Sequence, residues 1–118
     1  MSRYSGRLPR TFADAERMLG KREQKRLLNN TYAIRGGNGR VNIVHHNSII
    51  GAFDPDGSVM LTNAGYGSVS TRERLSAMTP PGVHFVQRQH VQRVQVDAQG
   101  IDEATGTLWI APDGTVTV

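Results

Sequence analysis

The stretch TYAIRGGNGRVNIVHHNSIIGAFDPDGSVML, residues 31–61, decides the fold expected for this chain. Apolar and polar side chains alternate through it with the period of two that is typical of half-buried strands. The sequence GGNG at 36–39 separates the expected strands 31–35 and 40–45, and its Asn-Gly pair suits a type I′ turn with two residues at positive φ. The stretch therefore predicts antiparallel β-structure.

Two further turns repeat this pattern. Pro55-Asp56-Gly57 and Pro112-Asp113-Gly114 each lie between short apolar runs, and both are typical turn sequences. They predict two more hairpins. The expected strands are 48–53 with 58–61, and 107–111 with 115–118.

One helix and one further strand region are expected between these hairpins. Ser70-Thr71-Arg72-Glu73 has the spacing of a capping box, which predicts a short helix over 71–78. Pro80-Pro81 then ends it, because proline cannot continue the helical hydrogen bonds. Residues 83–96 are rich in valine, but their alternation slips once near position 89, so two strands or one bulged strand are expected there.

The N-terminal part has a helical period instead. Between 10 and 28, apolar side chains gather on one side of a helix and basic ones on the other. Gly20 lies in the middle, so one helix or two short helices are expected. Asn29 and Asn30 follow, and we interpret them as the helix C-cap rather than as readers of base edges.

Length and composition limit the remaining choices. The 118 residues, with a mass of 12.9 kDa, predict a single domain over 10–118 after a flexible arm over 1–9. No apolar run reaches the length of a membrane span, and the chain has no cysteine. The expected fold class is α+β: a mostly antiparallel sheet of six to eight strands or a half-open small barrel, an N-terminal amphipathic helix and one short helix between hairpins.

The positive charge is concentrated at one end. Residues 1–28 carry eight basic and three acidic side chains, whereas the other ninety carry six and seven. This asymmetry indicates a polyanionic partner, although a solvated helix face explains it equally well. The predicted phosphate contacts are Arg17, Lys21, Arg22, Lys25 and Arg26, with Arg35, Arg40, Arg72 and Arg74 as extensions.

Two other segments are weaker candidate sites. Ser68, Ser70 and Thr71, beside two glycines and a helix start, outline an anion site, but helix capping is the simpler explanation. His45-His46 after a strand is similar to the opening of His-Asn-His nucleases, yet no further ligands follow at the required spacing. We therefore expect His45 to be a hydrogen-bonded core or edge residue, and Trp109 to pack in the core or on a sheet face. No catalytic residue, metal or cofactor is predicted.

About half of the chain resembles a known group of proteins. The similar segments, in unbroken order, are Leu27–Arg35, Ile43–Ile50, Pro55-Asp56-Gly57 and Ala64–Leu75. Together they are similar to small proteins of tailed bacteriophages, mainly of actinobacterial hosts, to which no activity is assigned. The resemblance implies a phage origin and a shared fold, without a mechanism.

These observations lead to one functional expectation and two alternatives. The first is a phage-encoded accessory protein that binds nucleic acid in the host cytoplasm, as the N-terminal charge indicates. The alternatives are a protein that binds and modulates a host protein, with the basic helix on an acidic surface, and a virion assembly component. The chain is not expected to be an enzyme, because no nucleophile, base and orienting group can be placed together from the sequence.

Overall fold

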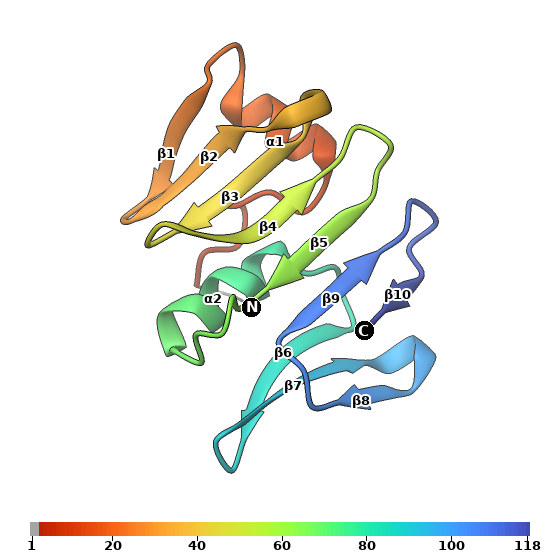
Figure 1. Cartoon of the computed structure of the whole chain (residues 1–118). Coiled ribbons are helices and arrows are strands. Elements are labelled where there is room, and N and C mark those ends of the chain that lie inside the picture. The colour runs from red at the N-terminus through yellow and green to blue at the C-terminus, as the bar shows by residue number, and fades with distance from the viewer. Residues whose placement is uncertain (1–2) are drawn as a thin grey trace.

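Ten strands form two antiparallel sheets in the computed structural model, which describes residues 3–118 (Figure 1). The strands are β1 (Gln24–Leu28), β2 (Thr31–Arg35), β3 (Val41–His45), β4 (Ser48–Phe53), β5 (Val59–Thr62), β6 (Val83–Arg88), β7 (Val91–Val96), β8 (Ile101–Glu103), β9 (Thr107–Ile110) and β10 (Val116–Thr117). The large sheet has the order β1-β2-β3-β4-β5-β9-β10, and the small one β6-β7-β8. The α+β class and the antiparallel sheet are confirmed, and the described residues form no closed barrel.

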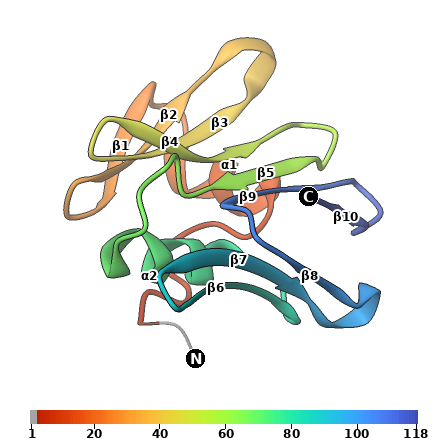
Figure 2. The same ribbon diagram turned by 60° about the horizontal axis from the view of Figure 1, so that its bottom comes forward.

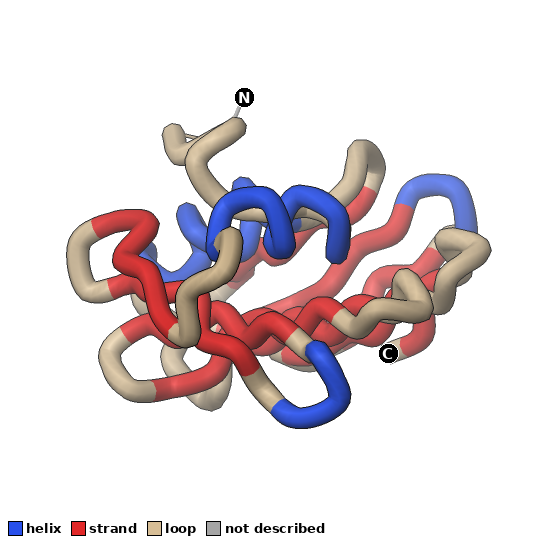
Figure 3. The backbone as a smooth tube through the Cα atoms, turned by 90° about the horizontal axis from the view of Figure 1, so that it is seen from above, coloured by secondary structure: helices blue, strands red, loops and turns tan. Residues whose placement is uncertain are grey.

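Both helices cover the same face of the large sheet. The helix α1 (Phe12–Leu19) contacts β1, β2 and β3, and α2 (Val69–Met78) contacts β4, β5 and β6. Figure 2 shows α2 and the small sheet on one side of the large sheet, and Figure 3 shows both helices on that side. The core therefore lies between the large sheet on one side and the helices with the small sheet on the other.

The register of the large sheet separates an inner from an outer face. Ala33, Ile43 and Leu61 share a row across three strands and are fully buried beneath the helices. Trp109 belongs to the neighbouring row on the opposite face, where it is 51 % exposed. It packs on the sheet rather than in the core, and no helix or strand of residues 3–118 covers that face (Figure 2).

The predicted N-terminal helix is too long. The helix α1 begins at its N-cap Thr11 and ends at Gly20, whose φ of 64° and ψ of −137° are accessible to glycine but not to residues with a side chain. The chain then reverses, and residues 24–28 form β1 at the edge of the sheet. The alternation of exposed and buried residues in β1 places Leu28 in the core.

Asn29 and Asn30 consequently do not cap a helix. They form the turn between β1 and β2, with Asn30 at a φ of 57°. The conformational argument for an asparagine at positive φ was right, but the element before it is a strand. The same occurs at 36–39, where Asn38 and Gly39 have positive φ as predicted, and at Gln89 and His90, where the turn confirms two strands over 83–96.

The N-cap of the second helix lies two residues before the position that the predicted capping box gave it. Ser68 is the N-cap of α2, and its hydroxyl accepts a hydrogen bond from the backbone N–H of Thr71. Ser70 therefore lies inside the first turn, where its side chain has other partners.

The expected arm over 1–9 belongs in part to the packed domain. Leu8 is 2 % exposed and contributes to the core, and Tyr4 packs against it. Residues 3–9 are thus anchored by apolar contacts. Residues 1 and 2 lie outside the described part of the chain.

Candidate functional site

Four cations line the segment that joins α1 to the large sheet and continues into β1. Lys21, Arg22 and Arg26 are exposed and Lys25 is half-buried. Within residues 3–118 none of the four forms an ion pair with a carboxylate, although Glu23 lies among them. In the described part of the chain, Arg26 donates its hydrogen bonds to neutral oxygens, those of Leu28 and Asn29. These four residues are named the cationic edge below.

The cationic edge follows a strand, which differs from the helix face expected from the sequence. Lys25 pairs in register with Ala33 on the inner face of the sheet, and Arg26 pairs with Tyr32 on the outer face. Neighbouring residues of a strand point to opposite faces. The charges therefore lie on both sides of the free edge of β1 and not in one stripe.

Three other predicted contacts are neutralised by carboxylates of the protein itself. Arg17 pairs with Asp14 at 3.2 Å and Arg40 with Asp54 at 2.7 Å. Arg35 donates to Glu16 and to the carbonyl of Gly20. The hydrogen bonds that Arg35 and Arg40 donate to Glu16 and Asp54 raise the pKa of both guanidinium groups, which therefore stay charged.

Arg72 and Arg74 do not extend the cationic edge either. Arg72 donates to the carbonyl of Gly67 at 2.7 Å and to the side chain of Gln87. Arg74 is 5 % exposed and lies beneath the inner face of the sheet. Of the nine predicted phosphate contacts, the structure therefore groups four and separates five.

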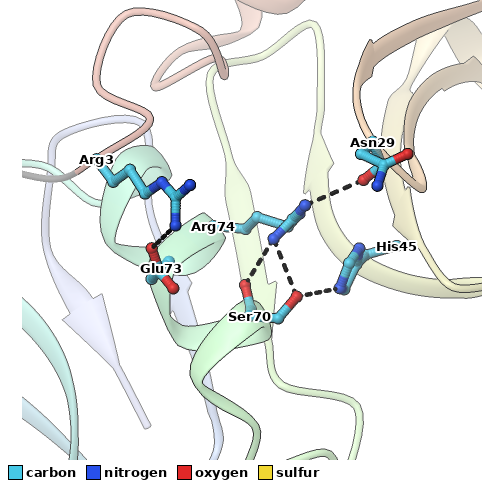
Figure 4. A network of polar contacts seen from close by, with 6 residues as sticks. All are labelled: Arg3, Asn29, His45, Ser70, Glu73 and Arg74. Carbon is cyan, nitrogen blue, oxygen red and sulfur yellow. Dashed lines mark hydrogen bonds and ion pairs between the residues drawn. The ribbon is translucent and has the colours of Figure 1, made fainter.

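Arg74 is the centre of a buried polar network (Figure 4). Its Nε donates to Thr31 Oγ1 at 2.7 Å, its Nη2 to the carbonyl of Asn29, and its Nη1 to the carbonyl and hydroxyl oxygens of Ser70, the last three at 3.0 Å. The guanidinium also lies over the ring of Tyr4, 5.0 Å from its centroid. Neutral oxygens and an aromatic face thus surround the buried cation.

His45 belongs to the same network and is 4 % exposed, which confirms the prediction of a hydrogen-bonded core histidine. Its Nδ1 is 3.0 Å from Thr31 Oγ1 and 3.2 Å from the carbonyl of Asn30, and its Nε2 is 2.9 Å from Ser70 Oγ. Burial, the charge of Arg74 and the neighbouring His46 lower the pKa of His45, against a smaller opposite effect of the bond to Asn30. The imidazole is therefore held in its neutral form.

One partial signal for this network is present in the sequence. Strand alternation placed His45 on the inner face, but Ser70 and Arg74 are on a helix 25 and 29 positions further along. Their positions one helical turn apart put them on the same side of α2. The contact between that side of α2 and His45 at the end of β3 forms only when the whole chain folds, so no local sequence pattern predicts it.

The three residues of the weak anion site have different roles. Ser68 caps α2, Thr71 is buried with its hydroxyl near that of Ser68, and Ser70 joins the buried network. The helix is capped by Ser68 and not by Ser70 with Glu73 as predicted, and Glu73 instead pairs with Arg3 at 3.7 Å (Figure 4).

Comparisons with protein-family models, curated proteins and solved structures found no match to this chain. Within residues 3–118, neither α1 nor α2 has the length and apolar character that a bilayer crossing requires. The cationic edge and the buried network are therefore the two features of the molecule that point to a function.

Proposed function

We propose that this chain is a phage-encoded accessory protein that binds nucleic acid by contacting phosphates with its cationic edge, in the host cytoplasm. One observation carries the proposal: Lys21, Arg22, Lys25 and Arg26 have no carboxylate partner in residues 3–118, whereas Arg17, Arg35 and Arg40 of the predicted set each have one. A cation without a partner keeps its full charge for an external anion.

The position of the cationic edge favours contact with a backbone rather than with bases. Its side chains are long, mostly exposed and distributed on both sides of one strand. Such cations displace counterions from a phosphate backbone whatever the base sequence. Binding is therefore expected to be sequence-independent and strongly salt-dependent.

A competing explanation of the same residues makes no use of a ligand. Lysine and arginine on an edge strand prevent the strand from pairing with another chain. The charge of β1 would then protect the protein from aggregation only. This explanation predicts no measurable affinity for nucleic acid at low salt.

A protein partner is the second candidate function, and one observation favours it. The outer face of the large sheet carries Trp109, 51 % exposed, and Ile49, 45 % exposed. Tryptophan is enriched in protein interfaces. A host protein or another virion component would bury this face, while the cationic edge would only assist.

A salt titration tests the first function directly. Fluorescence anisotropy of a labelled duplex of random sequence is measured between about 50 and 200 mM salt. With three or four phosphates contacted, log K is expected to fall with log salt at a slope of about −3, at roughly 0.9 per contact. Absence of binding at about 50 mM salt contradicts the proposal. The second candidate function is supported instead if a protein is captured from nuclease-treated host lysate and if this capture is lost when Trp109 is replaced.

A further inference from the structure

Ser70 and His45 form a pair that the proposed function does not use. The hydroxyl oxygen of Ser70 lies 2.9 Å from Nε2 of His45, within hydrogen-bond distance. A serine whose hydroxyl reaches a histidine is the arrangement by which a base activates a nucleophile, provided that the histidine is neutral and that Nε2 is unprotonated.

The surrounding hydrogen bonds fix that tautomer. The carbonyl of Asn30 can only accept, so the contact with Nδ1 of His45 requires a proton on Nδ1. Thr31 Oγ1 accepts from Arg74, and its own hydrogen is directed to the carbonyl of Asn29, so it too accepts from Nδ1. A neutral imidazole protonated at Nδ1 leaves the lone pair of Nε2 to accept the hydrogen of Ser70.

Arg74 adds a feature that a purely structural serine does not need. Its Nη1 donates to Ser70 Oγ at 3.0 Å, so a fixed positive charge lies against the oxygen that would become the nucleophile. Such a donor stabilises negative charge on Oγ. Because Arg74 is 5 % exposed, water screens this interaction only weakly.

Space for a reacting group lies beside His45, and although Ser70 does not itself line this space, Ser68 and Thr71 at the same helix start do. A cavity of about 170 Å³ is lined by His45, His46, Ile50, Tyr66, Ser68 and Thr71. Tyr66, which is 57 % exposed, belongs to this lining. At about 30 Å³ for each water-sized group, the cavity accommodates five or six such groups.

We propose that Ser70 is a nucleophile, activated by His45, that accepts a small acyl group from an ester. Ser70 Oγ attacks the carbonyl carbon and its proton moves to Nε2 of His45. The bond from carbon to the leaving oxygen then breaks, and that oxygen takes the proton from Nε2 to leave as an alcohol. The products are acyl-Ser70 and the alcohol, and water attacking the acyl-serine, with His45 again as base, releases the acid.

The charge of Arg74 also sets the expected rate pattern. It favours negative charge on Ser70 Oγ but disfavours the imidazolium that His45 becomes. Within residues 3–118 the hydrogen-bond partners of His45 are neutral groups, so no carboxylate bonded to it stabilises that cation. A good leaving group accelerates formation of the acyl-serine, whereas hydrolysis of the acyl-serine has only the base His45 to accelerate it. The acyl-serine is therefore expected to accumulate after one turnover. This inference is independent of nucleic-acid binding and departs from the expectation that the chain is not an enzyme.

The test is acylation of the full chain by p-nitrophenyl acetate, followed by intact mass and peptide mapping. A single acetyl group on Ser70, formed with a burst of p-nitrophenol, is expected. Ser70→Ala abolishes this label, and His45→Gln slows it by about 100-fold, the usual contribution of a general base. Ser76→Ala, a matched serine on the same helix, leaves it unchanged. Label confined to lysines or to the N-terminus, or no label on Ser70, overturns the proposal.

A pH profile separates a base from a merely structural histidine. The rate of Ser70 acetylation should rise with pH and level off, with its midpoint below the ordinary histidine value of 6.5, because the pKa of His45 is lowered. In His45→Gln the rate should lack this midpoint. Thermal unfolding of each variant shows that it is folded. A wild-type profile without the midpoint contradicts the role of His45 even if Ser70 is labelled.

Discussion

The cationic edge leaves its four charged side chains at the surface, whereas Arg74 lies almost wholly inside the protein. Lys21 and Arg22 have no partner among the described carboxylates, while Arg74 donates four hydrogen bonds to oxygens of Asn29, Thr31 and Ser70. The cationic edge and Arg74 carry the same kind of charge, but their different surroundings give them different roles. Charge at the edge is available to a partner, and charge at Arg74 is used to hold α2 against the sheet.

Replacement of Arg74 should have the largest effect on stability. Arg74→Ala removes a buried cation and its four hydrogen bonds to Asn29, Thr31 and Ser70, so the free energy of unfolding is expected to fall by about 3 kcal/mol. Urea unfolding measures this change. Arg22→Ala is the matched control and should stay within about 0.5 kcal/mol of wild type. Equal losses in the two variants would contradict the contrast between them.

Acid should weaken the buried network before it affects the surface cations. The pKa of His45 is lowered in the folded protein, so the unfolded chain binds a proton first as the pH falls below about 6.5. The contribution of His45 to stability is therefore complete above that pH and is lost as the pH falls through its lowered folded value. Chemical denaturation between about pH 7.5 and 5 should show this decline, and His45→Gln should reduce it. An unchanged pH dependence in the variant would show that His45 is not its source.

The ion pairs of the surface should matter least. Arg40 and Asp54 are both partly exposed, so Arg40→Gln is expected to change the free energy of unfolding by less than about 1 kcal/mol. Because Asp54 already neutralises Arg40, duplex affinity should also remain close to wild type. Thermal unfolding and anisotropy test both statements. A large loss of duplex affinity in this variant would mean that Arg40 leaves Asp54 to contact phosphate.

The large sheet could be predicted from the sequence because the signals for its strands and turns are local. Strand alternation and the turns at 36–39 and 55–57 depend on neighbouring residues only, and the structure keeps them. The prediction of a long N-terminal helix was wrong beyond Gly20. The helical spacing of apolar residues continues past this glycine in the sequence, but the backbone conformation of Gly20 ends the helix. Beyond it, β1 is stabilised by pairing with β2, which outweighs its helical pattern.

The candidate sites were predictable in the same limited way. The excess of cations between 21 and 26 is visible in the sequence, and the structure keeps those four available. The loss of Arg17, Arg35 and Arg40 to Asp14, Glu16 and Asp54 depends on which carboxylates the fold brings near. The meeting of Ser70 with His45 depends on the packing of α2 against β3, and a single sequence records no such contact.

The central claim is that the cationic edge, rather than net charge, binds phosphates. Two variants that remove equal charge test it by the salt slope of duplex binding. One replaces Lys21, Arg22, Lys25 and Arg26 by Gln, and the other replaces the ion-paired Arg3, Arg17, Arg40 and Arg93 by Gln. The first is expected to lose most of the wild-type slope, about 3, and the second to keep the wild-type slope. Equal loss in both variants, or a wild-type slope in the first, would contradict the claim.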